Sequence, residues 1–266
     1  MTNSFFTTQD LCAGYHGHTV LHHISFQLQE HTLTGLLGNN GCGKTTLLKA
    51  LCCLLPHTGQ SAYQGVPLES MSLRQRSRIV SYIPQRSSIT ISMSALDVVL
   101  MGFNATLGLL KQPSPAQRDE ALQSLEQVGI AHLAHTDYLK LSEGQKQLCI
   151  LARTLIEKAP LLLLDEPDSA LDFTNRFAIL HTLEQVVQNR PAAGLLCLHD
   201  PLLALEYCNQ LLLLKDGKCV CILHPATDSV SHMEAALQQI YGPLSLTACT
   251  DSSGKRHLVM LPHNNC

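Results

Sequence analysis

Residues 38–46 read Gly-Asn-Asn-Gly-Cys-Gly-Lys-Thr-Thr, and no other stretch constrains the fold of this chain so strongly. They fit the pattern G-x-x-x-x-G-K-[ST], a glycine-rich loop that cradles phosphate groups. The apolar residues 33–37 precede the loop like a short buried strand, and residues 46–55 behind it suit a helix that Pro56 ends. A loop between a strand and a helix N-terminus offers free backbone N–H groups and a favourable dipole to an anion. The sequence therefore predicts a nucleoside triphosphate site.

The side chains of this loop have separate chemical tasks. Glycines let the backbone close around phosphates, Lys44 supplies a positive charge to the outer phosphates, and the Thr45 hydroxyl can hold Mg²⁺. Cys42 stands near Lys44 and the helix N-terminus, which both lower the pKa of a thiol. Cys42 is therefore either a reactive thiol that ATP protects or a small residue without chemical consequence. The loop residues expected to contact ATP are Gly38, Asn39, Asn40, Gly41, Cys42, Gly43, Lys44, Thr45 and Thr46.

A second group of polar residues ends a buried strand. Residues 161–164 are four leucines, as in a strand that is covered on both faces, and Asp165-Glu166-Pro167 follow directly. Adjacent carboxylates are costly to bury at the end of such a strand unless a cation or a water molecule uses them. We expect Asp165 to hold Mg²⁺, directly or through water, and Glu166 to accept a proton from the attacking water.

Composition limits the class of protein. The 266 residues are 45% hydrophobic and 15% charged, which suits one large domain or a core with a subdomain and excludes a disordered chain. The formal net charge of -3 argues against a nucleic-acid partner. No apolar run approaches the roughly 18 residues of a membrane helix. Residues 1–10 lack a signal-peptide pattern, so we expect a cytosolic protein.

Cysteine and histidine spacings match no metal-binding motif. The 11 cysteines include the adjacent pair Cys52-Cys53, but no C-x-x-C pair. In a reducing compartment the expected role is that of small buried hydrophobic residues, and a structural zinc site is the less favoured alternative. The histidines near the N-terminus are expected to be hydrated surface residues rather than a metal cluster.

The pattern along the chain predicts an α/β core that is interrupted by a helical block. Between residues 89 and 156 the periodicity is helical, and strand patterns lie before and after it. Gln85 follows a strand and His199 ends another, which is where ligands of open α/β sheets bind. Strands are expected within 11–30 and at 61–67, 79–83, 161–164, 194–198, 211–214, 218–222, 244–247 and 258–261; helices at 74–78, 95–101, 115–128, 145–156, 172–187 and 233–241.

Residues 141–145, Leu-Ser-Glu-Gly-Gln, closely resemble the LSGGQ signature of ATP-binding cassette (ABC) ATPases. The other motifs follow in the order of that family, over about residues 10–225. They are Tyr15 as the adenine-stacking aromatic, 38–46 as Walker A, Gln85 as the Q-loop, 161–166 as Walker B, Ser169, Ala170, Leu171 and Asp172 as the D-loop, and His199 as the switch histidine.

The resemblance implies a P-loop NTPase core of α/β class, with an ABC-type antiparallel β subdomain and an inserted helical subdomain. The expected boundaries are 1–88 and 157–225 for the nucleotide-binding core with its N-terminal β subdomain. Residues 89–156 would form the helical signature subdomain, and 226–266 a C-terminal extension.

The resemblance also implies an ATPase that works as a homodimer. Each ATP would lie between Walker A of one subunit and the signature of the other, where Ser142 and Gly144 would contact the γ-phosphate. Glu143 replaces the first glycine of the signature, and we expect its side chain to point outward and activity to survive. The implied catalytic residues are Glu166, His199 and Lys44, the Mg²⁺ residues Thr45, Gln85 and Asp165, and the signature residues Ser142, Glu143, Gly144 and Gln145.

A finer resemblance is to the ATPase subunits of bacterial importers for iron-siderophores, haem, cobalamin and, in some branches, molybdate. Residues 94–102, the loop 107–109, and the tail 237–242 and 259–262 carry it. It implies an integral-membrane permease, a substrate-binding protein as an indirect partner, and a peripheral position on the cytoplasmic face of the inner membrane. The surface from Ser87 to Met101, beside Gln85, is expected to receive a permease helix.

Three alternatives compete with the importer. An exporter cassette stays open, because the cassette does not set the direction of transport. Soluble ABC ATPases that act on DNA or the ribosome usually carry long coiled-coil insertions or two cassettes in one chain, and neither is seen here. A degenerate cassette that only binds nucleotide would lack Lys44, Glu166 or His199, and all three are present.

Overall fold

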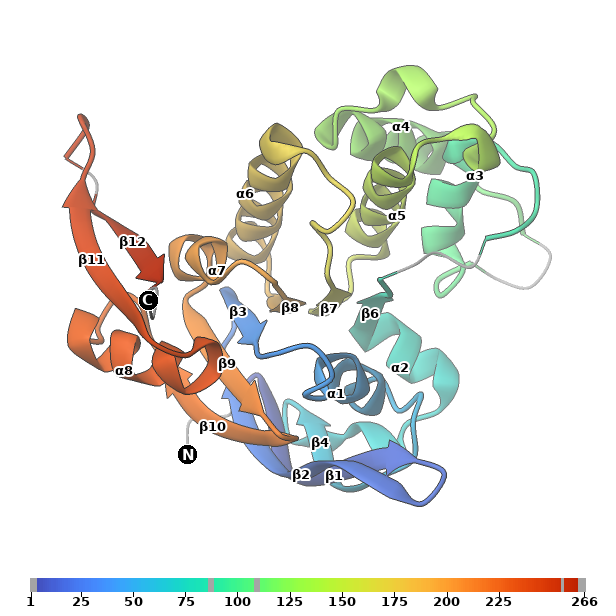
Figure 1. Ribbon diagram of the computed structural model, residues 1–266. Helices are drawn as coiled ribbons and strands as arrows, with labels where there is room; N and C mark the ends of the chain where they lie inside the picture. Colours follow the sequence, from blue (N-terminus) through green and yellow to red (C-terminus); the bar gives the residue numbers. More distant parts are fainter. Residues whose placement is uncertain (1–3, 86–88, 108–110, 255, 263–266) are drawn as a thin grey trace.

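A six-stranded sheet forms the centre of the computed structural model, which describes residues 4–85, 89–107, 111–254 and 256–262 (Figure 1). Its strand order is β10-β9-β3-β8-β7-β6, and every neighbouring pair is parallel except β9 and β10. The carboxyl ends of β3, β6, β7 and β8 therefore meet at one edge. The strands are β3 Thr32–Leu37, β6 Val80–Ile83, β7 Leu161–Asp165, β8 Ala193–Cys197, β9 Gln210–Lys215 and β10 Lys218–Leu223.

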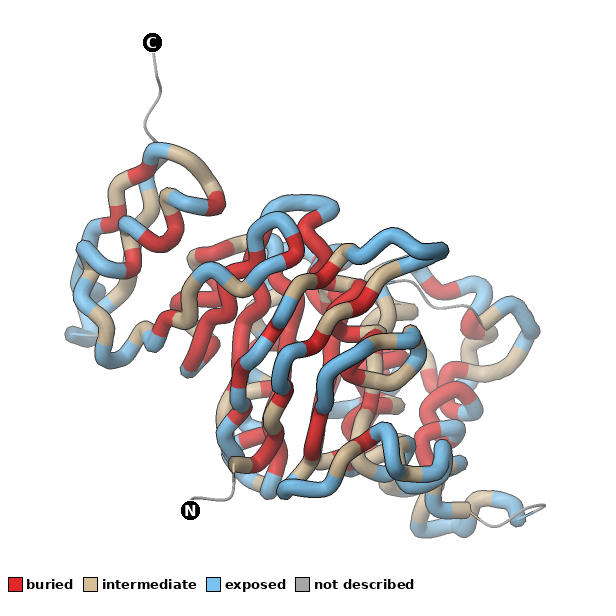
Figure 2. Tube along the Cα trace, turned by 90° about the horizontal axis from the view of Figure 1, so that it is seen from below, coloured by how far each residue is buried: buried red, intermediate tan, exposed pale blue. Residues whose placement is uncertain are grey.

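Two hydrophobic cores cover the two faces of this sheet, because alternate residues of a strand point to opposite sides. In β7, Leu161 and Leu163 belong to the core that contains α1 (Lys44–Leu51), whereas Leu162 and Leu164 belong to the core with α6 (Phe173–Asn189). Figure 2 shows the buried residues concentrated in these strands. The prediction of a strand buried on both faces is confirmed, and it places Asp165 at the buried strand end.

A second, four-stranded sheet is antiparallel and has the order β2-β1-β4-β5. Its strands are β1 Phe6–Tyr15, β2 His18–Leu28, β4 His57–Tyr63 and β5 Val66–Pro67. The 3₁₀ turn η1 (Leu68–Ser70) and the helix α2 (Leu73–Ile79) follow. The prediction of one strand at 61–67 is wrong, because Gln64 and Gly65 have φ of 48° and 81° and turn the chain between β4 and β5.

Helices fill the stretch between β6 and β7, at one end of the molecule in Figure 1. Serine side chains cap three of them, at Ser94, Ser114 and Ser142. The last helix begins two residues before the predicted Gln145, because Ser142 and Gln145 form a reciprocal capping box. The elements are α3 Ala95–Leu100, η2 Met101–Phe103, α4 Pro115–Gln127, η3 Ala131–Leu133, η4 Tyr138–Lys140 and α5 Glu143–Glu157. The predicted domain boundaries stay predictions.

The C-terminal segment packs on the opposite end of the molecule from the helical block (Figure 1). It contains α8 (Val230–Tyr241) and the antiparallel strands β11 (Leu244–Thr250) and β12 (Arg256–Pro262), which confirms the predicted helix and strands of the tail. The helix α7 (Pro201–Tyr207), which the sequence analysis missed, begins at the N-cap Asp200 with proline in the first turn.

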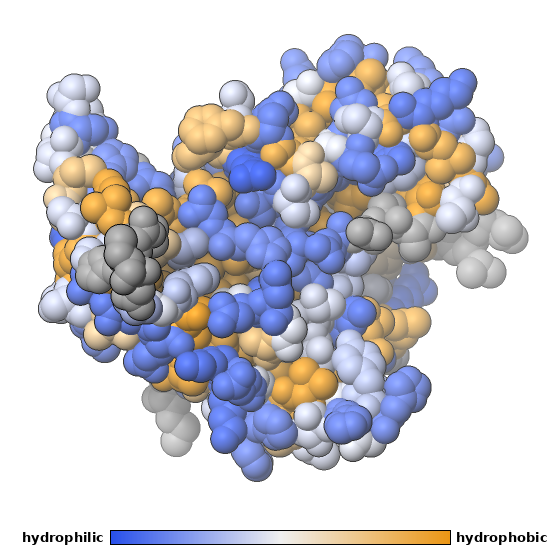
Figure 3. Space-filling model, viewed as in Figure 1, coloured by the Kyte–Doolittle hydropathy of each residue, from blue (hydrophilic) through white to orange (hydrophobic). Residues whose placement is uncertain are grey.

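The face shown in Figure 3 is mostly hydrophilic, with apolar side chains in separate small patches. Within the described residues, every helix is too short or too polar to cross a membrane. Arg86, Ser87 and Ser88, on which part of the predicted permease surface falls, lie outside the described residues, as do Gly108 and Leu109 of the loop 107–109.

Candidate functional site

The phosphate loop joins β3 to α1, as the sequence predicts. Gly43 has a φ of 108°, and a Cβ atom there would meet the Leu21 side chain at 2.7 Å, so the loop requires glycine at this position. A pocket of about 300 Å³ opens over the loop; its lining residues are Val20, Asn40, Gly41, Gly43, Lys44, Thr45, Thr46 and Glu166.

The Lys44 side chain curls back over this loop. It is 7% exposed, and its ammonium Nζ donates to the carbonyl oxygens of Gly38 at 2.6 Å and Asn39 at 3.2 Å. These partners are neutral, so the buried charge is not balanced by them. An anion in the adjacent pocket would supply the missing countercharge.

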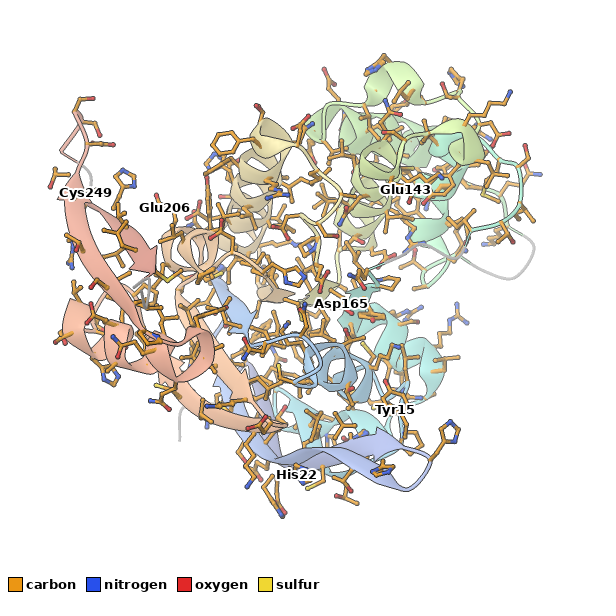
Figure 4. All side chains as sticks on the ribbon, viewed as in Figure 1. Tyr15, His22, Glu143, Asp165, Glu206 and Cys249 are labelled. Atoms are coloured by element: carbon orange, nitrogen blue, oxygen red, sulfur yellow. The ribbon has the colours of Figure 1, made fainter. Side chains whose placement is uncertain are left out.

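Asp165 has the environment of a cation ligand. It is 1% exposed, and both carboxylate oxygens lack a hydrogen bond of good geometry. Burial raises the pKa of Asp165; the Thr45 hydroxyl and the Cys197 thiol lie near enough to oppose this shift, but they do not outweigh it. A buried carboxylate with unpaired oxygens beside the Thr45 hydroxyl fits a hard divalent cation such as Mg²⁺. Figure 4 shows Asp165 at the centre of the molecule.

Glu166 is held between the two polar residues that end neighbouring strands. Its Oε1 lies 2.6 Å from His199 Nε2, and its Oε2 accepts a hydrogen bond from Gln85 Nε2. The Glu166 side chain is 13% exposed, in contrast to 46% for His199. The backbone of Glu166 has a φ of 54°, which is uncommon for a residue with a side chain and frequent at active sites. The structure thus brings together three residues that lie far apart in the sequence.

Gln147, which the sequence analysis missed, links the signature helix to this cluster. Its amide Nε2 donates to the Glu166 carbonyl at 2.8 Å, and its Oε1 accepts from Ala170 N–H at 3.2 Å. One side chain therefore connects α5 with the backbone of Glu166 and with Ala170 of the predicted D-loop. Asp172 has a different local task, because it caps α6 by accepting from Asn175 N–H.

The signature residues Ser142, Glu143, Gly144 and Gln145 form the first turn of α5 and the residue that caps it; Ser142 and Glu143 are exposed, and Gly144 and Gln145 are half-buried. The Glu143 side chain is 78% exposed and pairs with Lys146 at 2.8 Å, as expected for a side chain that points outward. The signature does not line the pocket over the phosphate loop of its own chain. Figure 4 shows Glu143 on the helical block and Asp165 in the central part.

Two predictions about single residues have different outcomes. Tyr15 is exposed at the end of β1 and lies outside the residues that line the phosphate-loop pocket, so its stacking on adenine stays a prediction (Figure 4). The expectation that the pKa of Cys42 is lowered is wrong. Cys42 is 8% exposed, and burial raises the pKa of its thiol more than the nearby Lys44 lowers it.

Comparisons with known proteins agree with this geometry. Residues 21–169 match the family described as ABC transporter. The chain is 40% identical over 195 residues to an uncharacterized ABC transporter ATP-binding protein of Haemophilus influenzae, covering 73% of this chain and 74% of the relative. It is 34% identical to the hemin import ATP-binding protein HmuV of Vibrio cholerae, covering 90% of this chain and 92% of the relative.

A solved structure of a transporter has a similar fold. An inward-facing conformation of a metal-chelate type ABC transporter superposes with a TM-score of 0.80 at 25% identity, covering 97% of this chain and 98% of that one. The chain belongs to the ABC transporter family, and it is an ATPase of that family.

Proposed function

We propose that this chain hydrolyses ATP as one of two identical nucleotide-binding subunits of a membrane importer for metal chelates. The Glu166 carboxylate, held by Gln85 and His199 beside the phosphate loop, is the observation that carries the proposal. Relatives named for hemin import and for metal-chelate transport support the cargo class, which includes iron-siderophores, haem and cobalamin. An importer of molybdate or another compound and an exporter remain the alternatives.

The proposed mechanism follows from the contacts of the residues that surround the pocket. The Lys44 ammonium leaves its neutral carbonyl partners and binds the outer phosphates of ATP. The Glu166 carboxylate accepts a proton from the attacking water, while the Gln85 amide and the His199 ring hold that carboxylate in place. Thr45, Asp165 and Gln85 would hold Mg²⁺, which would neutralise charge that develops on the phosphates.

Two copies are needed because one chain does not complete the site. The first turn of α5 offers free N–H groups, and it does not line the pocket over its own phosphate loop. In a head-to-tail homodimer the signature of each subunit would cover the nucleotide of the other. ATP would then favour the closed dimer by its differential affinity, and hydrolysis would release it.

The permease would dock in a groove of about 800 Å³ between α2 and the helical block. Two apolar side chains at this groove are exposed, Leu73 by 71% and Met101 by 38%, and Arg74 and Lys111 give it positive charge. An exposed apolar groove with a charged border fits an amphipathic helix of a partner protein. The same docking would place the chain on the cytoplasmic face of the inner membrane, with the substrate-binding protein as an indirect partner.

Uptake measurements with paired variants test the importer and its docking groove. Leu73→Asp should abolish cellular uptake of radiolabelled ferric siderophore, haem or cobalamin, while the purified subunit keeps its ATPase rate. Arg118→Glu, an exposed change on α4 outside the groove, is the matched control and should keep uptake. Normal uptake by Leu73→Asp would place the permease elsewhere, and ATP-dependent efflux of cargo would identify an exporter.

A further inference from the structure

A cluster of three metal-ligating side chains lies at the end of α1 that faces away from the phosphate loop. Cys53 follows this helix, His57 begins β4, and Glu69 lies in η1. One donor atom from each of them, a sulfur, a nitrogen and an oxygen, lies within 4.8 Å of the other two. The chain passes from the end of α1 into β4 (Figure 1), so the cluster lies between the phosphate-loop helix and the antiparallel sheet.

Backbone groups orient two of the three side chains. The His57 side chain is 5% exposed, and its Nδ1 lies 3.1 Å from the Leu55 carbonyl oxygen, so this nitrogen carries a proton and donates it. The other nitrogen, Nε2, faces Glu69 Oε1 at 3.0 Å, and Ser61 N–H donates to the same oxygen at 3.0 Å. Metal-binding histidines are usually fixed in this manner, with the second ring nitrogen on a carbonyl or carboxylate.

The contact between His57 and Glu69 places a ring nitrogen against a carboxylate oxygen. Since Nδ1 donates to the Leu55 carbonyl, Nε2 is the ring nitrogen directed at Glu69, as it would be in a metal ligand. Burial raises the pKa of Glu69, but the hydrogen bonds from His57 and from the backbone outweigh it, and the pKa is lowered overall. Glu69 is therefore an anionic ligand at neutral pH.

Cys53 occupies a backbone position that favours glycine. Its φ of 53° is left-handed, as at the residue that commonly ends a helix, where glycine is preferred because a Cβ atom is disfavoured. The chain thus has a thiol at a position where the backbone conformation alone favours glycine. The nearby thiol of Cys52 is different, because burial raises its pKa strongly and keeps it neutral.

We propose that Cys53, His57 and Glu69 bind one Zn²⁺ or a similar divalent transition-metal ion, with water as the fourth ligand. Thiolate, imidazole and carboxylate are the zinc donor set, whereas Mg²⁺ and Ca²⁺ require oxygen ligands. Tetrahedral zinc with bonds of about 2.0–2.3 Å separates its ligand atoms by roughly 3.3–3.8 Å. His57 Nε2 and Glu69 Oε1 are 3.0 Å apart, and all three donor atoms lie within 4.8 Å of one another, so the donors are already close to these separations.

Zinc ligands bind in their deprotonated form, so Cys53 would bind as a thiolate and His57 through an unprotonated Nε2, and any protons they carried would be released to solvent. The bound ion would tie the C-terminal end of α1 to β4 and η1. This site is separate from the predicted Mg²⁺ residues at the other end of the helix.

Cobalt titration of the full-length, chelator-treated protein tests the proposal. One equivalent of Co²⁺ should produce a thiolate-to-cobalt charge-transfer band, and one equivalent of Zn²⁺ should abolish it. Cys53→Gly is the informative variant, because glycine removes the sulfur ligand and also adopts the left-handed backbone conformation of this position without strain. We expect this variant to lose the band and to melt at no lower temperature than the metal-free wild type.

Two further variants complete the set. His57→Gln should weaken zinc affinity by at least about tenfold in calorimetry. Cys249→Ser, at an exposed cysteine on β11, is the matched control and should retain the band (Figure 4). A missing band in the wild type, or an unchanged band in Cys53→Gly, would overturn the proposal.

Discussion

Replacing Glu166 by glutamine separates its role as a base from its role in holding the site together. The amide has the shape of the carboxylate, so its oxygen can accept from Gln85 Nε2 while its NH₂ occupies the position of Oε1 beside His199 Nε2. The packing and the contact with Gln85 are kept, and the negative charge that accepts the water's proton is lost. Because His199 is 46% exposed, solvent screens its pairing with Glu166, and we expect unfolding stability to change by no more than about 1 kcal/mol.

The effect on hydrolysis should be much larger than the effect on stability. General-base catalysis contributes roughly 10²–10⁴-fold, so the barrier should rise by about 2.7–5.5 kcal/mol. Phosphate release should fall by that factor, ATP binding should persist, and gel filtration with ATP should show a trapped dimer. Glu184→Gln, on α6 and outside the pocket, is the control and should turn over normally. Wild-type turnover by Glu166→Gln would refute the assignment of Glu166 as the base.

Three further predictions concern other charged or thiol groups. Lys44→Ala should weaken ATP binding itself, by about 1.5–3 kcal/mol for a lost charged hydrogen bond, as nucleotide titration would show. Cys42→Ser and the wild type should lose activity to a maleimide at equal rates, since the Cys42 pKa is raised; slower loss in the variant, with ATP protecting the wild type, would support the reactive-thiol alternative. His257 contacts Asp251 and Glu206, which raise its pKa, so protonated His257 stabilises the β11–β12 hairpin below about pH 6.5, and this contribution is lost as pH rises through the raised pKa. The protection factors of the hairpin amides, which correct the exchange rates for the base-catalysed intrinsic rate, should therefore fall as pH rises above 6.5 in the wild type and not in His257→Gln.

The strand end that carries Asp165 and Glu166 was predictable because its sequence combines two requirements that rarely coincide. Four consecutive leucines indicate a strand that is buried on both faces, and the acids that follow are costly to bury unless a cation or water binds them. Asp165 and Glu166 could therefore be placed without knowledge of the whole fold. Gln85 and His199 were placed at the same edge of the sheet because each follows a predicted strand. Their convergence on Glu166 depends on the parallel order of β6, β7 and β8, which periodicity alone does not encode.

One error arose where tertiary packing overrides a local pattern, and two arose at local turn and capping signals. Lys44 and the helix dipole favour the Cys42 thiolate, but packing buries that thiol and reverses the direction of the shift, which no short stretch of sequence reveals. The strand predicted at 61–67 has suitable residues, yet Gln64 and Gly65 turn it into a hairpin. The helix α7 had a readable signal in Asp200-Pro201, and the interpretation of His199-Asp200 as a strand end obscured it.

Asn39 connects the phosphate loop with a part of the chain that carries no nucleotide motif. Its side-chain Nδ2 donates to the carbonyl of Ile240, and Lys215 donates to the neighbouring carbonyl of Gln239, both in the last turn of α8. These carbonyls have no partner within a helix that ends here, so the two side chains satisfy groups that would otherwise need water. Any rearrangement of the loop that moves Asn39 must break its bond to α8 or carry the helix along. The two hydrogen bonds therefore tie the last turn of α8 to the phosphate loop and to β9, although α8 contributes no side chain to the pocket over the loop.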